Sequence, residues 1–202
     1  MDESNNVRGA DNQQERLCNH GWVVGFVDGE GCFSCPLHRS PKTRLGWQVQ
    51  PRFVVVQGQS SRHVLEDLVR FFGCGRVGTN QRHDNHREDL SHYYVHRLSD
   101  LREIIIPFFE EHPLRTSKRD NFGKFAKVVC LMGLQRHLTV EGMAEIAAIT
   151  ETMNRRKPSE FLRILRDHTP TISASPAEMK RWSEPCGDAG RPAETTGPLA
   201  RN

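Results

Sequence analysis

Two acidic residues lie among glycines near the start of the chain, and they are its strongest candidates for metal chemistry. Asp28 and Glu30 alternate with Gly29 and Gly31 at the end of an apolar run that starts at Trp22. Hard divalent cations such as Mg²⁺ bind oxygen ligands, and carboxylates supply them. The pattern therefore predicts that one element delivers two carboxylates to the same place.

The element that must position these acids is predicted to be a helix over 17–29, because its apolar run carries no charge before Asp28. Gly21 and Gly25 lie four residues apart, so they share one helix face and permit a second backbone to approach closely. The apolar run is far too short to span a membrane. The glycines that follow the helix supply the turn that releases the chain into a strand.

The chain has 202 residues, with 28 Lys and Arg against 25 Asp and Glu, and this weak basic excess does not by itself establish nucleic-acid binding. We expect a flexible tail over 1–16, one folded domain over 17–168, and a disordered tail over 169–202, where periodicity is lost. The six cysteines are scattered and no signal peptide is seen, which favours a reduced, intracellular protein. A bacterial cytoplasm, a chloroplast and a mitochondrion fit equally. Cys32 and Cys35 have the spacing of a metal or redox pair, but without a second pair this is weak evidence.

Hydrophobic periodicity predicts an α+β fold in which strands and helices alternate. Strands are expected over 31–39, 47–57, 76–82 and 91–98. Further helices are expected over 60–72, 101–111, 119–133, 140–154 and 158–167. Pro107 lies inside one of these helices and predicts a kink there.

The second predicted strand has one apolar and one polar face. Its polar positions are Gln48, Gln50 and Arg52, while Phe53 and Val55 fall on the apolar face. Gln and Arg side chains form paired hydrogen bonds with adenine and guanine edges in the major groove of DNA. An ordinary strand facing solvent fits the same alternation equally well.

The stretch from Val23 to Gly31 resembles the motif of the LAGLIDADG homing endonucleases. Val23 and Val24 replace the usual Leu-Ala, and Glu30 replaces the commoner second Asp. The resemblance covers about 19–158, including the order of helices and strands and the basic segment that follows Pro113. It implies an αββαββα core with a saddle-shaped antiparallel four-stranded sheet, helices on its convex face, and extra C-terminal helices.

Only one copy of the acidic motif is present, which in this family implies a homodimer with DNA bound along the concave face of the sheet. The implied interface contains Gly21, Val24, Gly25 and Asp28, and Asp28 is expected to have a structural role. Two copies of Glu30, with Gly29, would then form a composite site for Mg²⁺, which Mn²⁺ or Ca²⁺ can also occupy.

The resemblance also implies which other residues take part in catalysis and DNA binding. Gln57 matches a family position that orients the water network, and Lys118 is expected to support the scissile phosphate. The side chains expected to contact DNA are Ser34, His38, Arg39, Lys42, Arg44, Gln48, Gln50, Arg52, Arg76, Asn80, Arg82, His92, Tyr94, His96, Arg115 and Arg119.

The implied function is sequence-specific double-strand cleavage of DNA at a long pseudo-palindromic site, as in intron homing, with no membrane partner. Two alternatives use the same core: an RNA maturase that assists the splicing of its host intron, and a DNA-binding regulator without catalysis. The presence of Glu30 and Gln57 favours cleavage over both alternatives.

Overall fold

The computed structural model describes residues 4–81, 88–154 and 158–168, with side chains from residue 17 onward. Within these ranges no helix is both long enough and apolar enough to cross a membrane. The expected tail over 169–202 lies outside the described residues.

The helix that carries the acidic motif, α1, runs from Ser4 to Glu30. The sequence predicted a flexible tail over 1–16, but α1 extends back through most of that segment. No proline interrupts the chain between Ser4 and Glu30, and Gln, Glu and Arg before Leu17 are good helix formers. The buried side of α1 includes Val23 and Val27.

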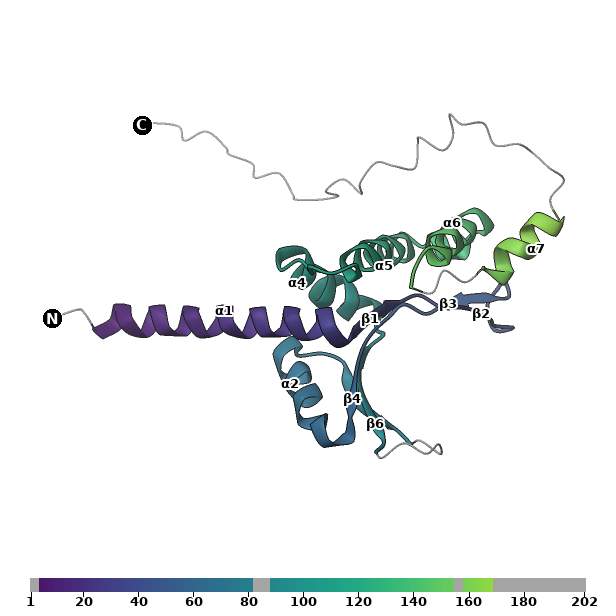
Figure 1. Cartoon of the computed structure of the whole chain (residues 1–202). Coiled ribbons are helices and arrows are strands. Elements are labelled where there is room, and N and C mark those ends of the chain that lie inside the picture. Colours follow the sequence, from purple (N-terminus) through teal and green to yellow (C-terminus); the bar gives the residue numbers. More distant parts are fainter. Residues whose placement is uncertain (1–3, 82–87, 155–157, 169–202) are drawn as a thin grey trace, which may run out of the picture. The chain divides into compact units, whose positions relative to one another are not determined.

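A four-stranded antiparallel sheet confirms the predicted α+β class (Figure 1). Its strands lie in the order β1 (Gly31–Ser34), β4 (Arg52–Gly58), β6 (Leu90–Val95) and β5 (Arg76–Asn80). The sheet curves, with α2 (Arg62–Phe72) on its convex side (Figure 1).

The strands predicted over 31–39 and 47–57 are each broken by a proline. The outer pieces, β2 (Leu37–Arg39) and β3 (Trp47–Val49), pair only with each other and form a separate ribbon. Pro36 and Pro51 have no N–H to donate to a ladder, so the assigned strands stop at them. Ser34 pairs with Arg52 and Leu37 with Val49, so one register continues through the break.

Helices cover one face of the sheet and form the core with it. The remaining helical elements are η1 (Gln59–Ser61), α3 (Leu98–Asp100), the π-helical turn η2 (Leu101–Ile105), α4 (Ile106–Glu111), α5 (Lys118–Gly133), η3 (Arg136–Leu138), α6 (Val140–Glu151) and α7 (Glu160–His168). Phe33 and Phe53 stack at 4.9 Å between ring centroids, and Phe109 meets both of them edge-on. These fully buried rings fix the helix layer against the sheet.

The helix expected over 101–111 is interrupted one turn before its proline. Pro107 donates no hydrogen bond and its ring crowds the carbonyl of Glu103, so the backbone widens into η2 before α4 begins. The kink predicted from Pro107 therefore appears as a π-helical turn.

Candidate functional site

The two acids of the motif lie at the end of α1 but have different surroundings. The Asp28 carboxylate accepts hydrogen bonds from the backbone N–H of Arg115 (2.8 Å), the backbone N–H of Thr116 (3.2 Å) and the Thr116 hydroxyl (2.6 Å). Glu30 is the last residue of α1 and is exposed. The Asp28 carboxylate is thus hydrogen-bonded to the segment before α5, whereas Glu30 is exposed to solvent.

The hydrogen bonds to Asp28 favour its ionised form. Burial raises the pKa of Asp28, but donation from Thr116 and Arg115, together with the positive charge of Lys118, outweighs this and lowers the pKa below its ordinary value of 3.8. Asp28 therefore remains a carboxylate at neutral pH and joins α1 to the start of α5.

Lys118 lies directly beside the same end of α1. Its Nζ donates to the carbonyl oxygen of Val27 (3.1 Å) and to that of Gly29. A cation is favoured at this position because the carbonyls of a helix C-terminus carry partial negative charge. Burial lowers the pKa of Lys118, and the negative charges of Glu30 and Asp28 oppose that effect. The structure thus brings together Gly29, Glu30 and Lys118 from two distant parts of the sequence.

Gln57 approaches this group along β4. Gly31 pairs with Val55, so β4 continues past the start of β1 and carries Gln57 toward the last turn of α1. Gln57 is partly buried and shares the face of Phe53 and Val55. The role of Gln57 in orienting water stays a prediction.

One chain offers an incomplete site for a divalent cation. Glu30 supplies an exposed carboxylate and Gly29 a carbonyl oxygen, and these hard oxygen donors suit Mg²⁺ or Ca²⁺. In the described part of the chain, no group of three or more His, Cys, Asp or Glu residues is placed to hold a metal. Cys32 is exposed and Cys35 is buried, so the two do not form a pair.

The face of the sheet opposite the helices carries seven of the sixteen predicted DNA contacts. Ser34 and Arg52 are cross-strand partners, and the Arg52 Nε donates to the Ser34 hydroxyl (3.3 Å). Tyr94 pairs with Arg76 across β5 and β6, and the Arg76 guanidinium lies 4.9 Å from the Tyr94 ring centroid. His92 and His96 flank Tyr94 along this face, with ring centroids 5.2 and 5.7 Å away. Asn80 lies near the end of β5 on the same side.

The same face includes residues that the sequence-based selection missed. Cys32, Val54 and Val56 point outward in register with Tyr94 and His92. The alternation that identified Arg52 also assigns Val54 and Val56 to this face, but only polar side chains were selected. The middle of the face is therefore more apolar than predicted.

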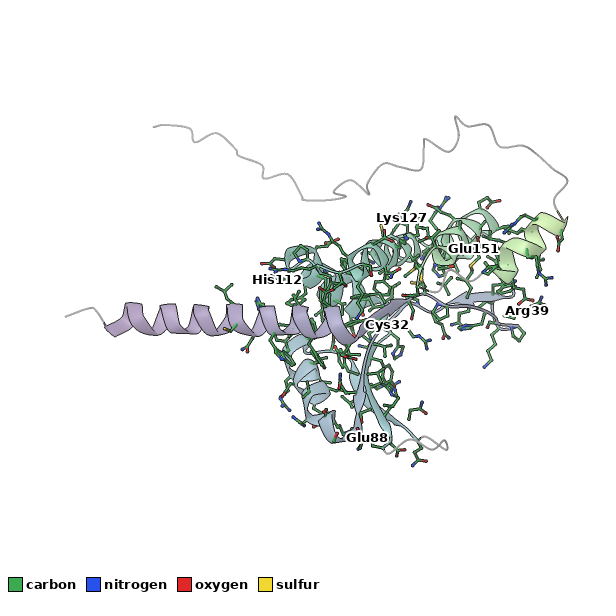
Figure 2. The ribbon with its side chains drawn as sticks, in the orientation of Figure 1. Cys32, Arg39, Glu88, His112, Lys127 and Glu151 are labelled. Atoms are coloured by element: carbon green, nitrogen blue, oxygen red, sulfur yellow. The ribbon has the colours of Figure 1, made fainter. Side chains whose placement is uncertain are left out.

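The β2–β3 ribbon separates two predicted DNA contacts onto opposite faces. His38 pairs with Gln48 on one side, and exposed Gln50 follows Gln48 at the strand alternation. Arg39 lies on the other side, over the Trp47 ring, and forms a 2.9 Å ion pair with Glu160. Figure 2 labels Arg39 at this ribbon. Arg39 therefore lies on the opposite face of the ribbon from His38, because consecutive strand residues point to opposite faces. Its contact with DNA stays a prediction.

The remaining predicted DNA contacts lie in loops or near the end of α1. Lys42 and Arg44 are exposed in the turn between β2 and β3, and Arg115 and Arg119 are exposed on either side of Lys118. Arg82 lies outside the described residues.

An open glycine face on α1 agrees with the predicted helix contact. Gly21, Gly25 and Gly29 are exposed, and a Cβ atom at any of them would meet no heavy atom within 4 Å. Leu17 and Trp22 flank this face and are 58% and 46% exposed.

Comparison with known proteins identifies the family. The model of the LAGLIDADG endonuclease family matches residues 23–129. A probable intron-encoded endonuclease of Neurospora crassa is 31% identical over 137 residues, which cover 67% of this chain but only 29% of that protein. The homing endonuclease I-ApeII of Aeropyrum pernix is 31% identical over 121 residues, which cover 60% of this chain and 68% of that protein.

Solved structures show the same fold. I-TnaI, a homing endonuclease, aligns with a TM-score of 0.65 and 38% identity over 73% of this chain and 96% of its own. I-LtrWI bound to target DNA aligns with a TM-score of 0.64 and 32% identity over 68% of this chain and 45% of its own. I-SmaMI bound to uncleaved DNA in the presence of calcium ions gives 0.64 and 31%, over 74% and 49%. The motif, the fold and these similarities together show that the chain belongs to the LAGLIDADG endonuclease family.

Proposed function

We propose that this protein is a site-specific DNA endonuclease that hydrolyses both strands of a long pseudo-palindromic duplex as a homodimer. The observation that carries the proposal is the convergence of Glu30, Gly29 and Lys118 at the end of α1, beside a curved sheet with polar side chains on its open face. The relatives named as homing endonucleases and the structures bound to DNA support it.

The homodimer is supported by the glycine face of α1 and by the share of the solved structures that this fold covers. The chain covers 96% of I-TnaI but only 45% of I-LtrWI, so the latter has room for about two copies of this fold. A symmetric dimer formed through Gly21, Gly25, Val24 and the Asp28 end of α1 would place the same patch of each copy together. Leu17 and Trp22 would be covered in such a dimer.

A divalent metal would complete the site between the two copies. Glu30 from each copy and the Gly29 carbonyl would hold it, and Mg²⁺ is the proposed physiological ion. When bound, the metal activates water and neutralises charge on the phosphate. Lys118 would stabilise the phosphate as charge develops, and Gln57 would orient water.

The strand residues on the open face would read base edges, while exposed Arg115 and Arg119 would contact the DNA backbone. We also propose that the protein acts inside the cell, in a bacterial cytoplasm or an organelle. Intron RNA as a second partner remains a subsidiary proposal.

The decisive experiment is cleavage of a randomised duplex-DNA library with and without Mg²⁺, comparing the wild type with Glu30→Gln. Metal-dependent cuts at one site by the wild type alone would support the proposal and identify the target. Selective binding without cutting by either protein would favour a DNA-binding regulator. If neither cuts nor binds duplex DNA, a splicing assay on the host intron RNA would test the maturase alternative.

A further inference from the structure

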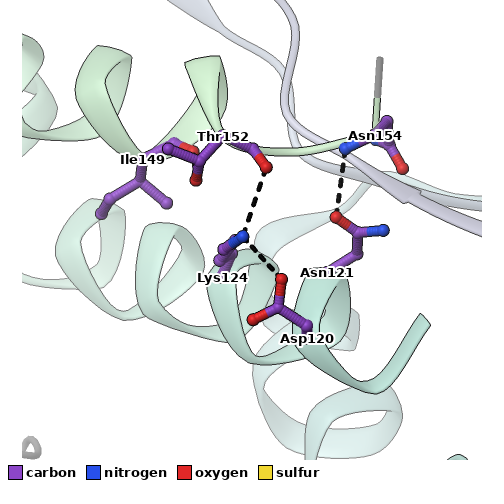
Figure 3. Close-up of polar contacts among 6 residues, drawn as sticks. All are labelled: Asp120, Asn121, Lys124, Ile149, Thr152 and Asn154. Carbon is purple, nitrogen blue, oxygen red and sulfur yellow. Dashed lines mark hydrogen bonds and ion pairs between the residues drawn. The ribbon is translucent and has the colours of Figure 1, made fainter. Parts of the chain in front are cut away.

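Asn154 touches both segments that carry the candidate catalytic residues. Its side-chain Nδ2 donates to the carbonyl oxygen of Phe33 on β1 (3.0 Å), and its backbone N–H donates to Oδ1 of Asn121 on α5 (3.1 Å, Figure 3). Phe33 is the third residue after Glu30, and Asn121 is the third residue after Lys118. One residue therefore joins the strand that leaves Glu30 to the first turn of the helix that starts at Lys118.

The backbone conformation of Asn154 suits this double contact. Its φ is +48°, in the left-handed region that asparagine adopts more readily than most residues. The asparagine amide also supplies the N–H donor that a carbonyl acceptor requires. Both the residue type and the backbone conformation thus match the position.

β1 needs such a contact because it is an edge strand of the sheet. An edge strand has no neighbouring strand on its outer side, so its outward backbone groups need other partners. Asn154 supplies one for Phe33, close to the junction with α1.

A second contact holds the same end of α6 on α5. The Lys124 Nζ donates to the carbonyl oxygen of Thr152 (3.2 Å) and pairs with the Asp120 carboxylate (2.6 Å, Figure 3). A positive charge at the C-terminal end of a helix is favourable. The end of α6 and the residues after it are therefore tied to the first turns of α5 at two points.

We propose that Asn154 is a positioning residue that fixes the distance between Glu30 and Lys118 by joining β1 to α5. This inference rests on the proposed function. Asn154 lies beyond the segment that matches the family model, residues 23–129. The contact that joins β1 to α5 thus comes from a part of the chain outside the matched segment.

The test substitution is Asn154→Gly. Glycine tolerates the left-handed conformation and keeps the backbone N–H, so only the side-chain bond to Phe33 is lost. Small displacements of reacting groups can slow catalysis about a hundredfold. We expect single-turnover cleavage to fall about tenfold or more, while the affinity for target DNA in Ca²⁺ stays within about threefold, because the reading face is unchanged.

The matched control is Thr139→Ala at the other end of α6. The Thr139 Oγ1 accepts the backbone N–H of Gly142 (3.1 Å) and caps the helix, so its loss weakens α6 without touching β1 or α5. Measured well below the Tm of both variants, this control should cleave at the wild-type rate. Equal slowing of both variants, or normal cleavage by Asn154→Gly, would overturn the positioning role.

Amide hydrogen exchange in the free protein tests, without a cleavage assay, whether Asn154 holds β1 and α5 together. Asn154→Gly should speed exchange in β1 and in the first turn of α5 more than Thr139→Ala does. Unchanged exchange in both segments would overturn the inference. If the wild type cuts no DNA, the proposed function fails, and the exchange measurement still decides whether Asn154 holds the two segments together.

Discussion

Two carboxylates only two positions apart can have different roles because their neighbours differ. Asp28 is surrounded by donors from Thr116 and Arg115, and they hold it in the ionised form. Glu30, at the exposed end of α1, keeps its oxygens available. The motif thus combines an acid held by hydrogen bonds with an acid exposed to solvent.

The pH dependence of stability should reveal the structural role of Asp28. The pKa of Asp28 is lower in the folded state than in the unfolded chain. Its contribution to stability is therefore fully present above about pH 3.8 and is lost as the pH falls through the lower pKa of the folded state. Asp28→Asn should therefore unfold at lower urea concentration than the wild type at pH 7. The difference between the urea midpoints of the two proteins should narrow below pH 3.8, which unfolding curves from pH 7 to pH 2.5 would show. A difference that stays the same over this range would contradict the assignment.

At the scale of elements, α1 carries two opposite faces with different purposes. Val23 and Val27 are buried against the core, while Gly21 and Gly25 face outward with open space around them. Glycine is a poor helix former, so an exposed glycine face lowers the stability of the isolated helix. Close packing against a second backbone would offset that cost.

Gly25→Leu should therefore change stability and association in opposite directions. Leucine favours helix over glycine by about 0.5–1 kcal/mol, so the monomer should become more stable. The larger side chain should hold the two helices apart and weaken the dimer, which sedimentation equilibrium would measure.

Gly123→Leu is the matched control for this substitution. Gly123 is exposed on α5, and a Cβ atom there also meets nothing within 4 Å. It should raise stability similarly and leave association unchanged. If both variants associate like the wild type, the glycine face of α1 is not the interface.

The elements were largely predictable because local patterns determine them. The alternation through Arg52, Phe53 and Val55 correctly separated the two faces of β4, and Gly73 ends α2 in a left-handed conformation. The element predictions that differed from the structure did so at single prolines. Pro36 and Pro51 break two predicted strands, and Pro107 follows the π-helical turn η2. His38 and Arg39 were both expected to contact DNA, but strand alternation places them on opposite faces of the ribbon.

The contacts within the candidate site were less predictable than the elements. The approach of Lys118 to Gly29 brings together residues far apart in the sequence, and only the family resemblance suggested it. Nothing local indicated that Asn154 would meet Phe33 and Asn121, because those contacts depend on how α6 packs. Long-range polar contacts leave no periodic pattern in the sequence.

At the scale of the whole molecule, the two sides of the sheet should differ in their effect on DNA selectivity. Arg52 lies on the open face, whereas Arg39 faces α7 and pairs with Glu160. Arg52→Ala should relax preference at one base-pair position by about 1–3 kcal/mol. Arg39→Ala should leave the preference profile unchanged, because its side chain points away from the bases. Binding to a set of single-base target variants would measure both profiles, and matching profiles would contradict the proposed reading face.

The proline break between the inner sheet and the β2–β3 ribbon also has a consequence for how substitutions in the two parts should act. The inner sheet shares its core with α1 and the residues beside Glu30, so substitutions there should disturb the candidate site and folding together. The ribbon is joined through Pro36 and Pro51 and carries His38 and Gln48 at its own paired positions. Substitutions in the ribbon, or its exchange for another hairpin of the same register, should therefore leave the candidate site beside Glu30 intact. Under the proposed function, recognition of outer base pairs would thereby be separable from the chemistry at Glu30.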